Sequence, residues 1–315
     1  MEHCELLIIG AGAAGMSAAA AAWESGVRDL VLVDSASAPG GILRQCSHPG
    51  FGRAVFDTEK TGPEYASFLF SRLEDTGVRL LTETEVLSVS GDRLAVLSSR
   101  KGLTELGFQR LILASGCRER SIGSLPIVGT RPAGVFTAGQ VQELLNLRKR
   151  LPGTDILILD SGDLGMIMAY QLQEAGAHVI ALVEQEDHYG GLPRNYHRFL
   201  EPIGVPLLLR TTVTELFGSG RLTGVLLRQL DTGKQIHLSC DTLVTAVGLI
   251  PDRALVSDLG SPAWLSFVGN CHHVHELVDS AVAEAASVGR LVASAFRETE
   301  HASAALPVLC RHPQQ

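Results

Sequence analysis

The residues whose types and spacing best indicate chemistry are three glycines and one aspartate near the N-terminus. Gly10, Gly12 and Gly15 follow the apolar run at residues 6–9, and Asp34 lies nineteen positions after Gly15, at the end of a second apolar run. In such a pattern the first glycine permits a tight turn, the second lets a pyrophosphate approach the backbone, and the third lets a helix pack closely on a sheet. The helix N-terminus adds N–H groups for the phosphates, and an acid at this distance binds ribose hydroxyls. These residues therefore predict a dinucleotide-binding βαβ unit.

The same pattern begins again in the middle of the chain. Gly162 and Gly165 follow an apolar run, and Glu184 again lies nineteen positions after the last glycine. This repeat predicts a second nucleotide site. Asp160, however, stands where the first glycine is expected, and a carboxylate beside a pyrophosphate is unfavourable unless its side chain points away. Because Gly162, the glycine that must approach the phosphates, is present, we retain the second site as a prediction.

The acid of the second site bears on the choice between the two nicotinamide nucleotides. Glu184 favours NADH, because a carboxylate pairs with the ribose hydroxyls and repels a 2′-phosphate. Arg194 and Arg198 follow closely in the sequence and could instead receive that phosphate. The sequence thus predicts NAD(P) binding and leaves NADH and NADPH open.

Cys46 and His48 are the candidates for catalysis. Cys46 lies twelve positions after Asp34, in a loop that leaves the carboxyl end of the predicted sheet, where ligands bind. Arg44 and His48 lie close in sequence and would favour its thiolate. The alternative is a cysteine that packs against a cofactor without reacting. His48 could donate a proton to a substrate, or could only hydrogen-bond the loop.

The remaining cysteines and histidines indicate neither a metal site nor a dithiol. Residues 271–275, Cys-His-His-Val-His, resemble metal ligands in composition, but zinc sites prefer spacings such as CxxC or HxxxH, so we expect no metal here. Cys117 precedes a charged stretch that is typical of a solvated hinge. Cys4, Cys240 and Cys310 have no predicted role, and no CxxC occurs in the chain.

The bulk composition narrows the class of protein. The 315 residues can form two domains, and a formal net charge of −8 argues against a nucleic-acid partner. Residues 6–23 are uncharged and long enough to mimic a membrane span, but they are rich in Gly and Ala and follow glutamates, so the dinucleotide unit explains them. We expect no membrane segment, and the scattered cysteines are consistent with a reducing cytoplasm.

The elements that must position these residues alternate between strands and helices. We predict strands at residues 6–9, 30–33, 79–90, 94–98, 111–116, 155–159, 179–183, 205–209, 223–228, 235–238 and 243–248. We predict helices after the glycines of each unit, from a capping box at Thr61 to about Gly77, and at about 275–296. The predicted fold is α/β, with two Rossmann-like dinucleotide-binding domains, residues 119–247 being inserted between residues 1–118 and 248–315.

With these features the chain resembles the pyridine nucleotide-disulfide oxidoreductase superfamily, in the compact form of the size of thioredoxin reductase. A narrower resemblance is to FAD-dependent oxidoreductases found beside glycerol-3-phosphate or amino-acid dehydrogenase subunits. It depends on the stretches GGILRQCSHPGFG, TGPEYA, SGCRER, RPAGVFTAGQVQ, SGDLG and GNCHHVHELVD. Without a CxxC the chain does not resemble a thioredoxin reductase in its chemistry.

The resemblance implies FAD in the first domain and NAD(P) in the second. The positions that it assigns to FAD are Gly10, Gly12, Gly15, Asp34, Gly41, Gly116, Gly269, Asn270 and His275, the last beside the N-terminus of the closing helix. Gly116 and Gly248 would end the strands that lead into and out of the inserted domain. Asn270 stands where the family usually has the aspartate that binds the flavin ribityl chain.

The expected function is therefore hydride transfer between NAD(P)H and a second acceptor or donor through flavin N5. The second small-molecule substrate would meet the flavin near Cys46 and His48, and a homodimer stays open as an assembly. One alternative is an FAD-containing electron-transfer subunit of an amino-acid or glycerol-3-phosphate dehydrogenase complex, with a partner redox subunit. The other is a non-catalytic dinucleotide-binding redox sensor, which only Asp160 supports.

Overall fold

A computed structural model of the chain describes residues 2–304, with side chains as far as residue 297. The chain divides into two compact units: Met1–Cys117 together with Pro251–Gln315, and Arg118–Ile250. The predicted crossings at 118 and 248 lie beside these boundaries. Within residues 2–304, no helix combines the length and the apolar character needed to cross a membrane.

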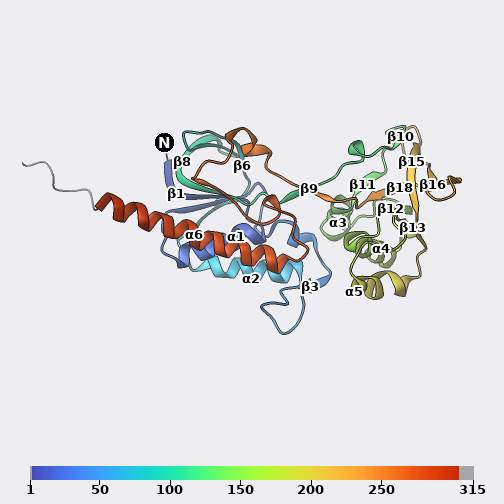
Figure 1. The fold of residues 1–315 in the computed structure, drawn as a ribbon, viewed down its shortest axis with the longest axis horizontal. Helices are drawn as coiled ribbons and strands as arrows, with labels where there is room; N and C mark the ends of the chain where they lie inside the picture. The colour runs from blue at the N-terminus through green and yellow to red at the C-terminus, as the bar shows by residue number, and fades with distance from the viewer. Residues whose placement is uncertain (1, 305–315) are drawn as a thin grey trace, which may run out of the picture. The chain divides into compact units, whose positions relative to one another are not determined.

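The first unit is built on a seven-stranded sheet (Figure 1). The strand order is β5-β2-β1-β8-β7-β6, and β20 pairs with the end of β8. The pairs among β5, β2, β1, β8 and β20 are parallel, and β6, β7 and β8 form an antiparallel meander. The bounds are β1 Glu2–Ile9, β2 Leu30–Val33, β5 Arg79–Leu81, β6 Thr84–Val89, β7 Leu94–Ser99, β8 Gly102–Leu113 and β20 Leu265–Phe267.

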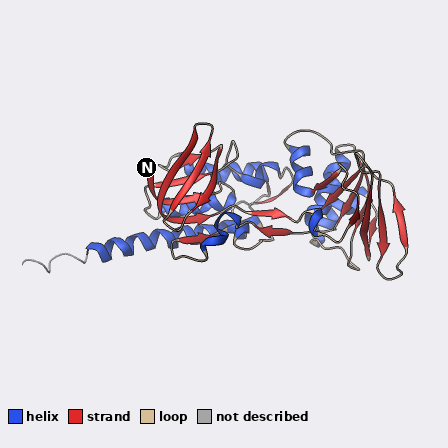
Figure 2. Ribbon diagram, turned by 90° about the horizontal axis from the view of Figure 1, so that it is seen from above, coloured by secondary structure: helices blue, strands red, loops and turns tan. Residues whose placement is uncertain are grey.

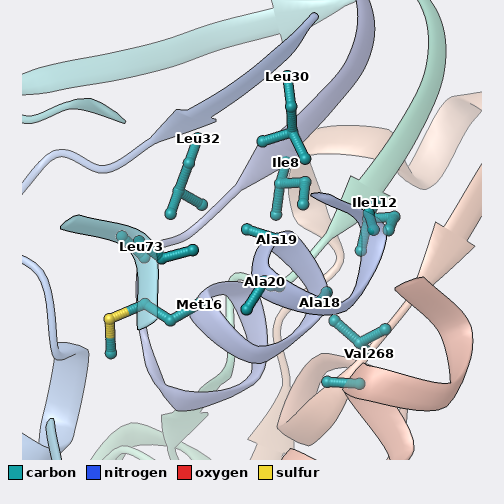
Figure 3. Packing of buried hydrophobic residues seen from close by; sticks show 14 of the residues in the cluster. Ile8, Met16, Ala18, Ala19, Ala20, Leu30, Leu32, Leu73, Ile112 and Val268 are labelled. Carbon is teal, nitrogen blue, oxygen red and sulfur yellow. The ribbon is translucent and has the colours of Figure 1, made fainter. Parts of the chain in front are cut away.

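Three helices pack together beside this sheet (Figure 1). They are α1 Ala13–Glu24, α2 Gly62–Glu74 and α6 Val278–Ala304. The alanines of α1 are buried between the sheet and the other helices, where Ile8, Leu30 and Ile112 contact the cluster from the strands (Figure 3). Small side chains let α6 approach α1 so closely that a Cβ at Gly289 would lie 2.4 Å from the carbonyl oxygen of Ala18.

The structure confirms the predicted start of one helix and shifts that of another. The capping box at Thr61 is present and opens α2, with Glu64 bonded to the Thr61 N–H at 2.7 Å. The closing helix, in contrast, begins at Val278 rather than near His275, because Asn270 accepts the N–H of His275 and holds it in a turn. In Figure 2, α6 is the long helix that runs past the strands of the first unit.

The second unit has a five-stranded parallel sheet and a four-stranded sheet. The parallel order is β11-β18-β12-β13-β14, and the other order is β10-β15-β16-β17. The helices of this unit are α3 Ala138–Asn146, α4 Asp163–Glu174 and the short α5 Pro193–Asn195. The strand bounds are β10 Val128–Gly129, β11 Val135–Thr137, β12 Asp155–Leu159, β13 His178–Val183, β14 Leu207–Leu208, β15 Thr211–Phe217, β16 Gly224–Gln229, β17 Gln235–Leu238 and β18 Thr242–Thr245.

The remaining strands are short. They are β3 Pro49–Phe51, which pairs with β4 Lys60–Thr61, and β9 Cys117–Glu119, which pairs with β19 Leu249–Pro251 along the two crossings between the units. The structure corrects one further prediction, because residues 205–209 contain only the two-residue strand β14, and it adds α3 and β15, which were not predicted. The predicted α/β fold with an inserted second Rossmann-like unit is confirmed.

Candidate dinucleotide and flavin sites

The first glycine turn connects β1 to α1 and excludes side chains at two positions. Gly10 has φ +104°, and a Cβ there would lie 2.4 Å from the carbonyl oxygen of Ala114. A Cβ at Gly15 would lie 1.8 Å from the carbonyl oxygen of Gly10. α1 begins after Gly12 without a side-chain cap, so its first N–H groups point out of the turn and can receive an anion.

Asp34 fixes this turn from the end of β2. One of its carboxylate oxygens accepts the N–H of Ala11 at 2.6 Å, and the other accepts the N–H of Ala36 at 2.8 Å. These bonds place the carboxylate at the carboxyl edge of the sheet, beside the glycine turn. An acid in this position can also bind ribose hydroxyls.

A second glycine pair closes on the same turn. The N–H of Gly40 donates to the carbonyl of Ala11 at 2.8 Å. Gly40 and Gly41 have positive φ, and a Cβ at Gly41 would lie 3.0 Å from the Cα of Gly12. The backbone of Gly41 therefore lies directly against that of Gly12, which only a residue without a side chain permits.

Gly269 and Asn270, the predicted FAD positions near the C-terminus, lie at the same edge of the sheet. A Cβ at Gly269 would lie 2.6 Å from the Cβ of Ala14, in the first turn of α1. The side chain of Asn270 accepts the N–H of His275 at 3.0 Å and donates to the Sγ of Cys117 at 3.6 Å. Cys117 follows Gly116, which has φ +77°. The structure thus brings the predicted FAD positions of the first unit together around one turn.

Cys46 does not have the environment that its sequence neighbours suggested. Its side chain is buried, its Sγ donates to the carbonyl of Ile42 at 3.2 Å, and burial raises the pKa of the thiol to about 12. Burial of the side chain therefore opposes the thiolate that Arg44 and His48 were expected to favour. His48 lies in the same loop, with its Nδ1 3.1 Å from the carbonyl oxygen of Pro49 and its ring against Phe51.

The second glycine turn repeats the first with a side chain added. Asp160 has φ +91°, close to the value at Gly10, and a Cβ at Gly165 would lie 2.5 Å from the carbonyl oxygen of Asp160. Glu184 is buried at the end of β13, where it accepts the N–H of Ser161 at 3.1 Å and its hydroxyl at 2.6 Å. Glu184 thus holds its turn as Asp34 holds the first one.

The carboxylate of Asp160 points into the turn. It accepts the N–H of Gly162 at 2.9 Å, which is the N–H that faces a pyrophosphate in this kind of unit. Burial, together with the nearby charge of Glu184, raises the pKa of Asp160, and the bond from Gly162 opposes that shift. A nucleotide phosphate at this turn must therefore displace or neutralise the carboxylate.

Gly190 and Gly191 are functional candidates that the sequence analysis missed. The N–H of Gly190 donates to the Ser161 hydroxyl at 3.0 Å, and the N–H of Gly191 donates to the Ser161 carbonyl at 3.2 Å. They close on the second turn as Gly40 and Gly41 close on the first. Each pair begins six positions after the acid of its unit, and this equal offset is the signal that could have identified them.

The comparisons with known proteins agree with this geometry. The family model of the pyridine nucleotide-disulphide oxidoreductases matches residues 4–264. The chain belongs to this family. Proteins of the family bind FAD and NAD(P), and the resemblance inferred from the sequence is confirmed.

Several curated relatives of this oxidoreductase chain are subunits of larger enzymes. The chain is 31% identical over 281 residues to hydrogen cyanide synthase subunit HcnB of Pseudomonas aeruginosa, which covers 81% of this chain and 59% of that protein. It is 31% identical over 205 residues to sarcosine oxidase subunit alpha of Rhizobium meliloti, covering 60% of this chain and 20% of that one. The chain therefore spans from a fifth to about three fifths of these two relatives.

Among solved structures, thioredoxin reductase of T. acidophilum has the same fold. Its TM-score is 0.77 at 20% identity, over 94% of this chain and 99% of that one. The L-proline dehydrogenase of P. horikoshii matches with a TM-score of 0.69 at 16% identity, over 93% of this chain and 56% of that chain. At these identities the likeness supports the fold and not the substrate.

Proposed function

We propose that this chain is an FAD-dependent oxidoreductase that transfers hydride between NAD(P)H and a second substrate. The first unit would hold FAD, and the second, Arg118–Ile250, would hold the nicotinamide nucleotide. FAD, when bound, supplies two-electron redox chemistry. The observation that carries the proposal is the repeated turn. Asp34 accepts the N–H of Ala11 and Glu184 accepts the N–H of Ser161, and in both units the helix that follows the turn has no side-chain cap.

The residues of the chain would position the cofactors and move protons. The N–H groups at the starts of α1 and α4 would bind the pyrophosphates, and Asp34 and Glu184 would bind the ribose hydroxyls. Asn270 would bind the flavin side chain. His48 remains the proposed residue for proton transfer to the second substrate, whereas Cys46 would only pack the loop.

An absorbance spectrum of the purified chain, followed by anaerobic titration with NADH and then NADPH, tests this proposal. We expect bound flavin that is bleached by NADH at lower concentrations than by NADPH, because Glu184 repels a 2′-phosphate. Bound flavin that neither nucleotide reduces would contradict the NAD(P)H-linked activity while leaving the flavin site intact. Absence of bound flavin even after incubation with FAD would contradict both the flavin site and the NAD(P)H-linked activity.

A relay subunit in a larger dehydrogenase is the second candidate, favoured by two observations. The carboxylate of Asp160 occupies the N–H of Gly162, and the names of several relatives describe subunits of oxidases or of a synthase. In this case the electrons would come from an amino acid or a polyol phosphate oxidised by a partner. The two candidates differ in whether the isolated chain turns over NAD(P)H with a generic acceptor.

A further inference from the structure

The histidine-rich turn after Gly269 contacts a glutamate of α6. His272 and His273 follow the short 3-10 segment Gly269–Cys271, and Glu284 comes from the second turn of α6. The Nδ1 atoms of both histidines lie 3.3 Å from Oε2 of Glu284 and 3.4 Å from each other. Adjacent histidines alone are poor partners for one ion, but α6 adds a ligand atom on their open side.

Nδ1 of His272 is within hydrogen-bond distance of both Oε2 of Glu284 and Nδ1 of His273, but all three distances also match the spacing of ligand atoms around one metal ion. Tetrahedral zinc with bonds of about 2.0–2.1 Å has its ligand atoms about 3.3–3.4 Å apart, so the three atoms match one face of the tetrahedron. A charge-assisted hydrogen bond would be shorter, at about 2.7–2.9 Å. Two Nδ1 atoms that face each other cannot both carry a proton without repulsion, whereas both lone pairs can point to a cation.

A third imidazole borders the same carboxylate. Nε2 of His275 lies 3.3 Å from Oε2 of Glu284, but outside hydrogen-bond geometry, and it has no hydrogen-bond partner among the described residues. Its side chain is 7% exposed. The buried Nε2 of His275 is thus a further polar atom beside the three ligand atoms, with no hydrogen-bond partner among the described residues.

The surroundings fix the ligands and leave an opening. Arg253 donates to the carbonyls of Cys271 and His272, which holds the turn in place. Oε1 of Glu284 accepts the N–H of Gly269 at 2.9 Å, so Oε2 is the oxygen that faces the histidines.

The side of the cluster away from the protein is open. The side chains of His272 and His273 are about half exposed. His272 also lines a cavity of about 370 Å³ together with Arg110, Phe267 and residues of α6. An ion could therefore enter from solvent and keep a position for water or a small ligand.

We propose that His272, His273 and Glu284 bind a divalent transition metal of the zinc type, with an open coordination position. Two imidazoles and one carboxylate suit Zn²⁺ and leave a fourth position for an exchangeable ligand. The metal would also stiffen the turn at Gly269, since Glu284 bonds that residue. The proposal does not depend on the nucleotide that the second unit binds.

Titration of the full chain with zinc tests this site. The purified protein is first treated with a chelator to remove bound metals. We expect one Zn²⁺ per chain by calorimetry and by metal analysis. Zinc affinity should fall by at least about a hundredfold in His273→Ala and in His272→Ala, because loss of a ligand costs at least as much as loss of a residue that only orients one. Co²⁺ should give the visible spectrum of a site with nitrogen ligands. Because both histidines are exposed, their variants should melt like the parent chain without metal.

His197→Ala is the matched control. His197 is an exposed histidine bonded to Glu201 at 2.9 Å in the second unit, and its loss should leave zinc binding unchanged. Glu284→Gln should also lose zinc binding. Because that variant can disturb the Gly269 turn as well, the test of the proposal depends on the two histidine variants. No saturable binding up to millimolar zinc, or equal binding by the His272→Ala/His273→Ala double variant, would overturn the proposal.

Discussion

At the scale of single residues, the two nucleotide turns depend on carboxylates as much as on glycines. Asp34 and Glu184 each take a loop N–H from the turn that precedes them in their unit. Asp160 adds a third carboxylate at the position that Gly10 occupies in the first unit. The φ angles of Gly10 and Asp160 are similar, so the carboxylate of Asp160, together with Asp163 in the first turn of α4, is what distinguishes the charge of the second turn from that of the first.

Gly15→Ala should abolish FAD binding. Its Cβ would overlap the carbonyl of Gly10 and contact Ala114, and because these atoms belong to the backbone and core, the turn itself must move. We expect a loss of unfolding free energy of about 1–3 kcal/mol, the usual range for overpacking. Flavin absorbance after gel filtration and denaturant unfolding are the measurements. Gly91→Ala, at a position with open space around it, is the control and should retain both properties.

Asp160→Gly should bind NADH at least about tenfold more tightly, which corresponds to about 1.4 kcal/mol. The carboxylate repels the pyrophosphate and occupies the Gly162 N–H, and the variant removes both effects. Asp160→Asn keeps a hydrogen-bond acceptor for the Gly162 N–H but removes the charge, so it separates the effect of the hydrogen bond from the effect of the charge. Calorimetric titration with FAD already bound gives the affinity. Weaker or equal binding by Asp160→Gly would contradict this account of the second turn.

The charge of Asp160 also predicts a dependence on pH. Its pKa is raised, so the group is neutral at low pH and gains its charge as the pH rises through that raised value. NADH affinity of the parent chain should therefore fall over this interval, and affinity of Asp160→Asn should change less. An identical pH profile for the two proteins would rule out Asp160 as the source.

At the scale of elements, close packing between α1 and α6 determines how the carboxyl edge of the first sheet is built. α6 carries Glu284, which bonds Gly269, and α1 carries the glycine turn against which Gly269 packs. The small residues along α1 allow this approach. The position of the histidine-rich turn thus follows from a helix–helix contact.

Gly289→Ala tests the contact between α1 and α6, because the substitution can either raise or lower the free energy of unfolding. In an exposed helix the change would stabilise by up to about 1 kcal/mol, because alanine is the better helix former. Here the new Cβ would lie 2.4 Å from the Ala18 carbonyl, so we expect a lower free energy of unfolding instead. Thermal or denaturant unfolding measures this free energy. Ser287→Ala, at an exposed position on the same helix, is the control. Stabilisation by Gly289→Ala would show that the helices are farther apart.

At the scale of the whole molecule, the chain forms two units, each with its own turn, acid and glycine pair. The first is made of two segments that are distant in sequence, and the second is continuous. Each ligand should therefore stabilise its own unit. A ligand at about a hundred times its Kd adds about 2.7 kcal/mol to the stability of the form that binds it.

Hydrogen exchange should separate the two sites. FAD should slow exchange mainly in residues 2–117 and 251–297, and NADH mainly in Arg118–Ile250. Mass spectrometry of peptides from each unit, with and without each ligand, gives the result. Protection of the first unit alone by NADH would contradict the assignment of the second unit to the nicotinamide nucleotide.

The local features of both sites could be predicted from the sequence. Gly10, Gly12, Gly15 and the acid nineteen positions later describe a strand, turn, helix and strand whose geometry depends on near neighbours in the chain. The capping box at Thr61 is likewise local. Spacing of this kind determined the α/β class, the repeat of the unit and the family.

Only the tertiary structure decided what depends on direction, burial and contacts between distant segments. The spacing places Asp160 in the turn but does not say that its carboxylate points to Gly162, and it does not reveal that Cys46 is desolvated. The cluster of His272, His273 and Glu284 exists because α6 folds back along α1 and brings a residue from twelve positions away to the histidines. Such juxtapositions follow from side-chain packing, which leaves no periodic signal in the sequence.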